Sequence, residues 1–132
     1  MKQLLFAIFI PFLFLAACSD GDHPAINGMW QLKTIDDGNN RVQQVDTVFY
    51  AFQRQAVFSY TILPQEENKS PIYGYIDFPD RNRLHIQLDK NHYYQAKLTL
   101  WNDTSVVYDI HRLDAKQLVL SHNGSVYRFS KY

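Results

Sequence analysis

The chain has 132 residues, with 13 basic and 13 acidic side chains and a formal net charge of zero. This balance leaves no basic stripe for nucleic acid, and the single cysteine excludes an internal disulfide and a cysteine-based metal site. The length fits one folded domain that follows a short leader.

The first predicted element is a hydrophobic leader. Lys2 gives it a positive start, and residues 4–15 are almost entirely apolar. This run is too short for a membrane-spanning helix, which needs about 20 apolar residues, and it suits a secretory signal. A membrane span and an ordinary signal peptide are the alternatives, but Pro11 and the polar residues 19–22 argue against the span.

The leader ends in Leu15-Ala16-Ala17-Cys18, which resembles the lipobox of bacterial lipoproteins. The resemblance implies cleavage between Ala17 and Cys18, acyl chains such as palmitate on the Cys18 thiol, and an outer-membrane lipoprotein held in the cell envelope. Residues 19–22 resemble the acidic export signal of surface lipoproteins in Bacteroides-type bacteria, although a solvated tether explains them equally well. The predicted organisation is a signal peptide at 1–17, a lipidated N-terminus and tether at 18–27, and a folded domain at 28–132.

From Gly28 onward, short runs of alternating apolar and polar residues indicate β-strands separated by turns. Asn123-Gly124 is a strong signal for a two-residue hairpin turn, and residues 64–71 are expected to form a loop. About eight strands without a long amphipathic helix predict an all-β fold, an antiparallel up-and-down β-barrel. The expected strands lie at 30–34, 45–52, 56–62, 72–78, 84–88, 93–101 (which could begin with a helical turn), 106–110, 118–120 and 127–129.

Two parts of this domain resemble lipocalins. Asn27-Gly28-Met29-Trp30 is similar to the Gly-X-Trp of the first lipocalin strand, and residues 108–131 resemble the closing hairpin of small lipocalin-like lipoproteins from Bacteroides-type bacteria. The resemblance implies a lipocalin-like barrel whose base is closed by Gly28 and Trp30, with Arg128 as the basic residue beside Trp30. If Tyr127 and Phe129 point inward, strand alternation would instead turn Arg128 outward.

Two hypotheses of function follow from the resemblance and the aromatic strands. The first is a small hydrophobic or amphipathic ligand bound in the barrel, with Tyr50, Tyr60, Tyr75 and Tyr108 as candidate lining residues. The second is a protein-interaction module, an inhibitor or an accessory subunit of an outer-membrane complex, with a barrel filled by its own side chains. Packing of the tyrosines as core and wall is the alternative to a ligand site.

Catalytic and metal-ligating patterns are weak in this chain. The acid pairs Asp36-Asp37 and Glu66-Glu67 fall in loop-like sequence without a companion residue, so solvated loops explain them. No two histidines have the His-x-x-x-His spacing of a local metal site. We therefore expect no enzyme activity, no metal and no cofactor, with surface positions for His23, His85, His92, His111 and His122.

Overall fold

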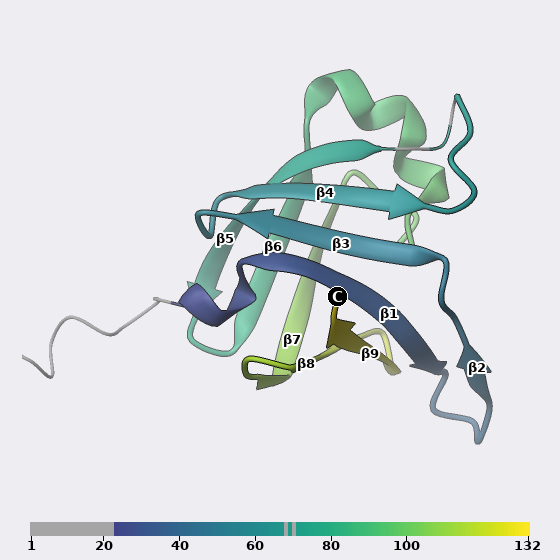
Figure 1. The fold of residues 1–132 in the computed structure, drawn as a ribbon, viewed down its shortest axis with the longest axis vertical. Coiled ribbons are helices and arrows are strands. Elements are labelled where there is room, and N and C mark those ends of the chain that lie inside the picture. The colour runs from purple at the N-terminus through teal and green to yellow at the C-terminus, as the bar shows by residue number, and fades with distance from the viewer. Residues whose placement is uncertain (1–22, 68, 70) are drawn as a thin grey trace, which may run out of the picture.

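The computed structural model describes residues 23–67, 69 and 71–132, which form a closed antiparallel β-barrel (Figure 1). Eight strands follow one another around the wall in chain order, and pairing of the first with the last closes the barrel. The predicted up-and-down barrel is therefore confirmed. The lipobox and its cleavage site lie outside the described residues. The wall strands are β1 (Gly28–Asp36), β3 (Val48–Gln53), β4 (Val57–Ile62), β5 (Ile72–Asp80), β6 (Arg83–Leu88), β7 (Ser105–Leu113), β8 (Gln117–His122) and β9 (Ser125–Lys131).

A ninth, short strand extends the wall without adding to its circumference. β2 (Val42–Gln44) pairs with the end of β1, on the same side of β1 as β3. The strand predicted over 45–52 therefore begins three residues later than expected, at Val48, and residues 45–47 separate β2 from β3. The backbone N–H of Val45 still donates to the carbonyl of Lys33 at 2.9 Å, so β1 stays covered across the break.

Alternation along the strands separates the core from the outer surface. In β5, Ile72, Gly74 and Ile76 are buried, whereas Tyr73 and Tyr75 between them are exposed. This pattern follows from the two-residue period of a strand, which sends successive side chains to opposite faces. The hairpin between β8 and β9 is the predicted one: Asn123 and Gly124 have φ of 50° and 80°, the positive values that such a tight turn requires.

The prediction of a strand at 93–101 is wrong. These residues belong mostly to a 3-10 helix, η3 (Lys90–Leu98), which lies beyond the strands at one end of the barrel, beside β5 (Figure 1). Asp89 caps this helix, because its carboxylate accepts a hydrogen bond from the backbone N–H of Asn91 at 2.9 Å. After the helix, Trp101 packs against Tyr60 and Phe58 with ring centroids 5.9 and 6.2 Å apart, and this segment covers that end of the core.

A shorter 3-10 helix, η2 (Pro24–Ile26), precedes β1 and covers the opposite end with the fully buried Ile26. The expected loop at 64–71 is confirmed for its described residues. Neither helix in the described parts of the chain combines the length and the apolar character that crossing a membrane demands.

Candidate functional site

The base of the barrel is built around Trp30 on β1. Its side chain is fully buried, and its indole Nε1–H donates to the carbonyl of Ile26 at 2.7 Å. Lys131, at the end of β9, places its Nζ 4.4 Å from the centroid of the Trp30 ring and donates to the carbonyl of Asn27. The cation over the ring and the two hydrogen bonds attach η2 to both the first wall strand, β1, and the last, β9.

Gly28 is required at this base for two reasons. Its φ of +115° is a conformation that side-chain-bearing residues rarely adopt, and a Cβ there would lie 2.8 Å from Cε and Nζ of Lys131. The glycine thus lets the lysine cross the backbone and reach Trp30. Arg128 does not take this place, contrary to the expectation from the lipocalin resemblance: it is exposed on the outer face of β9, between the buried Tyr127 and Phe129.

The barrel interior is crossed by a hydrogen bond between two tyrosines. The hydroxyls of Tyr50 on β3 and Tyr108 on β7 lie 2.9 Å apart, and both side chains are fully buried. β3 and β7 are opposite strands of the wall, because three strands separate them in either direction. Two side chains that meet from opposite walls occupy the full width of the barrel.

Further aromatic rings fill the space around this pair. Tyr50 contacts Phe129 and Tyr60 with centroids 4.7 and 5.3 Å apart. Burial raises the pKa of Tyr50, Tyr60 and Tyr108 above the ordinary value of 10.0, and an interaction with the backbone of Leu100 partly offsets this rise at Tyr60. Three of the four candidate ligand-lining tyrosines therefore contact core side chains in a packed interior.

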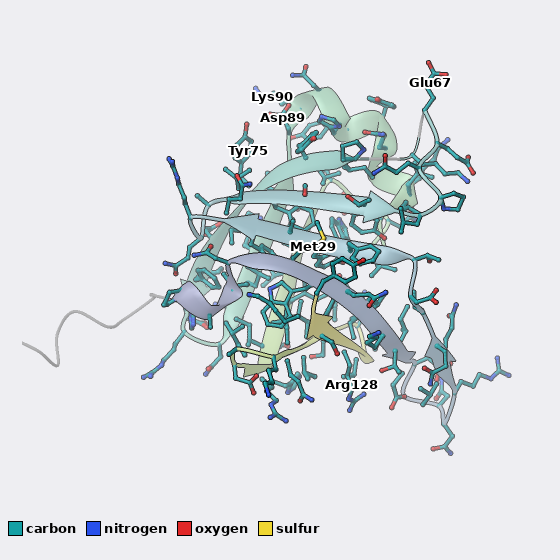
Figure 2. All side chains as sticks on the ribbon, in the orientation of Figure 1. Met29, Glu67, Tyr75, Asp89, Lys90 and Arg128 are labelled. Atoms are coloured by element: carbon teal, nitrogen blue, oxygen red, sulfur yellow. The ribbon has the colours of Figure 1, made fainter. Side chains whose placement is uncertain are left out.

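The fourth candidate, Tyr75, lies on the outside of the barrel, with 54% of its surface exposed. It is the cross-strand neighbour of Gln87 on β6, and its hydroxyl donates to Oδ2 of Asp89 at 2.8 Å. Figure 2 shows Tyr75, Asp89 and Lys90 close together near η3, far from Arg128. An open groove of about 450 Å³ runs along this part of the wall, and it is lined by Tyr75, Gln87, Leu88, Asp89, Lys90, Asn91 and Tyr93.

Hydrogen bonds hold the polar groups of this groove in place. The backbone N–H of Asp89 donates to the carbonyl of Tyr73 at 2.9 Å, and the amide of Gln87 donates to the hydroxyl of Tyr93 at 3.2 Å. The backbone N–H of Asn91 and the hydroxyl of Tyr75 lower the pKa of Asp89, so its carboxylate is ionised at neutral pH. The groove therefore presents two aromatic rings and a fixed acceptor to solvent.

The comparisons with known proteins agree with this architecture. The family model described as "Lipocalin-like domain" matches residues 13–132. The chain belongs to this lipocalin-like family. Among solved structures, a lipocalin-like protein from Bacteroides uniformis has a TM-score of 0.73 at 22% identity, covering 82% of this chain and 99% of the other. An uncharacterized protein from Bacteroides eggerthii has a TM-score of 0.66 at 23% identity, covering 81% and 99%.

At these identities the two structures establish the fold of the lipocalin-like chain and nothing about its ligand. No curated protein matches it.

His85 and His111 lie in the wall of this lipocalin-like barrel and have partners on neighbouring strands. His85 lies 2.6 Å from a carboxylate oxygen of Asp77, and the His111 ring lies 2.7 Å from the hydroxyl of Ser121. Across the described ranges of the chain, no three His, Cys, Asp or Glu side chains come together as a metal site would require.

Two features of these sites escaped the sequence reasoning. Lys131 carries a usable signal, because it stands two residues after Phe129 and so shares the inward parity of that residue. The groove has almost no signal in the sequence. Its residues come together around Tyr75 only through the β5–β6 register, which places Gln87, and the fold of η3, which places Asp89 and Tyr93.

Proposed function

We propose that this lipocalin-like protein is a non-enzymatic binding module of the cell envelope, anchored by acyl chains on Cys18, and that it binds its ligand on the outer wall of the barrel. The observation that carries this proposal is the Tyr50–Tyr108 hydrogen bond across the interior. An eight-stranded barrel is just wide enough for its own side chains to fill it, and here bulky aromatic ones do so.

A hydrophobic or amphipathic ligand inside the barrel is the alternative that the family resemblance supports. Such a ligand would have to separate Tyr50 from Tyr108 and leave their buried hydroxyls without partners, which costs about 1–3 kcal/mol for each group. It would also have to displace Trp101 or open the base at Trp30. The outer wall needs no such rearrangement, because the Tyr75 groove is already open.

Apolar-probe binding tests where recognition takes place. The full chain, purified from cells in mild detergent, is titrated with an environment-sensitive fluorescent fatty acid, and native mass spectrometry follows any co-purified lipid. We expect no saturable binding of the fatty acid and no lipid beyond the acyl chains attached covalently at Cys18. Tyr108→Ala serves as the positive control, because the truncation opens a space in the interior that an apolar probe can enter. Stoichiometric binding of the fatty acid to the unaltered chain would contradict the proposal.

The anchor is tested separately. Cys18→Ala should abolish incorporation of labelled palmitate and move the protein from the membrane to the soluble fraction, because two or more acyl chains are needed for stable anchoring. Ser19→Ala is the matched control and should leave both readouts unchanged. Unchanged membrane fractionation of the Cys18 variant would remove the envelope address from the proposal.

A further inference from the structure

The groove on the outer wall combines aromatic surface with fixed polar groups. Tyr75 comes from β5 and Tyr93 from η3, with exposures of 54% and 41%, and Leu88 beneath them is almost completely buried. Both hydroxyls form hydrogen bonds, that of Tyr75 with Asp89 and that of Tyr93 with Gln87. The rings are thus presented in defined positions.

We infer that this groove is a saccharide-binding site, in which a pyranose ring lies against Tyr75 and Tyr93 while Asp89 and Gln87 bind its hydroxyl groups. The inference rests on the outer-wall recognition proposed above. A pyranose has C–H groups on its faces and hydroxyls around its rim. The negative face of an aromatic ring attracts the partly positive C–H groups, and a carboxylate accepts hydrogen bonds from hydroxyls.

The chemistry of Asp89 fits this role. A carboxylate offers about four acceptor positions, and here Oδ1 accepts from the Asn91 N–H and Oδ2 from the Tyr75 hydroxyl. Both oxygens keep acceptor capacity for a ligand, and the two bonds hold the group still. Preorganised acceptors lose little freedom when a ligand arrives.

Charge and shape favour a neutral saccharide over other small ligands. Among the lining residues, Asp89 and Lys90 carry opposite charges, so the groove has no excess charge for an anion or a cation. Sites for apolar ligands are lined mainly by hydrophobic side chains, whereas Leu88 is the one aliphatic residue here. The volume of about 450 Å³ lies in the range of small-molecule sites.

A peptide is the less suitable occupant. Extended peptides commonly bind by adding a strand to a free sheet edge, but β5 and β6 are each paired on both sides. Helical peptides need a hydrophobic groove with several apolar anchors, and this groove provides polar ones.

Saturation-transfer NMR tests the inference on the full chain in a detergent without a sugar headgroup. The probes are glucose, galactose, mannose and N-acetylglucosamine, each as monomer and as linear oligomer. We expect transfer to the C–H protons of at least one of them. Tyr75→Ala and Tyr93→Ala should each weaken its affinity about tenfold, the upper end of what one aromatic contact contributes. Asp89→Asn, which preserves the helix cap, should weaken it as well.

Tyr94→Ala is the matched control. This tyrosine is 67% exposed on the same helix but does not line the groove, so its loss should change affinity less than twofold. Thermal unfolding of each variant identifies any loss of binding that comes from misfolding.

Absence of transfer from every saccharide would overturn the saccharide assignment, as would binding that the three groove variants leave unchanged. Neither result touches the outer-wall proposal, which fails only if the apolar probe saturates the interior of the unaltered chain. Capture of an envelope protein that depends on Tyr75 and Tyr93, without saccharide binding, would likewise reject the saccharide and retain the outer wall.

Discussion

The hydrogen bond between Tyr50 and Tyr108 can be tested by removing each hydroxyl in turn. Tyr50→Phe and Tyr108→Phe keep the aromatic rings and delete only the oxygen atoms that lie 2.9 Å apart in the barrel interior. Each single change leaves the other hydroxyl buried, so each should destabilise the fold by about 1–3 kcal/mol. The double variant removes both hydroxyls together and leaves no buried hydroxyl without a hydrogen-bond partner.

The double variant should therefore cost about as much as one single change and clearly less than the sum of two. For singles near 2 kcal/mol, we expect a coupling of about 2 kcal/mol, within the range found for contacting residues. Urea unfolding followed by tryptophan fluorescence gives the free energies, since both indoles are buried. The slope with urea should stay constant, because the variants expose the same surface on unfolding.

Strict additivity would refute the reasoning. It would mean that the two hydroxyls have separate partners, such as buried water, and that the interior is wider than a bridge of two side chains. Tyr94→Phe, on an exposed tyrosine, controls for the general effect of the substitution and should change stability by less than about 0.5 kcal/mol.

Three further predictions concern the same core and the wall around it. Burial raises the folded-state pKa of the three interior tyrosines above the unfolded value of 10.0. Their contribution to the free energy of unfolding is therefore fully present below pH 10 and falls above it by about 1.4 kcal/mol per pH unit for each tyrosine. The share of the phenolate absorbance that comes from these three tyrosines, obtained by difference from a variant with phenylalanine at all three positions, should appear together with the loss of the circular dichroism signal; its appearance before unfolding would contradict the prediction. Lys131→Met removes the cation over Trp30 and should lower the free energy of unfolding, measured in urea, by about 1 kcal/mol. An unchanged midpoint would show that the contact between Lys131 and Trp30 does not stabilise the fold. Gly74→Ala would place a Cβ 2.4 Å from the carbonyl oxygen of Gln87 and should lower the free energy of unfolding by about 3 kcal/mol or more. Gly124→Ala, whose Cβ would meet no atom within 4 Å but whose φ is positive, should lower it by about 1 kcal/mol in the same urea assay. Equal losses for the two variants would show that β5 and β6 move apart easily to accept the Cβ.

The barrel was predictable because its strands are regular. The wall strands alternate apolar and polar residues over most of their length, and turn residues separate them, as at Asn123-Gly124. Alternation depends only on the two-residue period of a strand, so a single sequence suffices to recognise it. The same pattern placed one expected strand on each of the eight wall strands, and a ninth, at 93–101, that the structure replaces with η3.

The segment at 93–101 misled because its composition suits both structures. Tyr93 and Tyr94 have high strand propensity, but Asp89 is a strong helix cap and begins η3 instead. Strand propensity measures how a side chain packs in a sheet, and the β6–β7 connection offers no neighbouring strand for these tyrosines to pair with.

The base and the groove depend on contacts between distant residues, which local patterns do not encode. Lys131 reaches Trp30 only after β9 has paired with β1. A register shift between Leu32 and Thr34 changes which β9 residue lies opposite each β1 residue. Alternation with Phe129 therefore indicates the face on which Lys131 lies, but not that its partner is Trp30.

The alternation of inward and outward side chains along each strand divides the candidate tyrosines into buried and exposed groups. Tyr50 and Tyr108 share the inward face of their strands with Phe52 and Val106, and they meet in the centre of the barrel. Tyr75 alternates with inward residues on β5 and therefore faces solvent. Because the inward rings occupy the width of the barrel, aromatic surface that a ligand can reach without unfolding part of the core lies on the outward positions. This is the physical reason for seeking recognition at the groove and not in the interior.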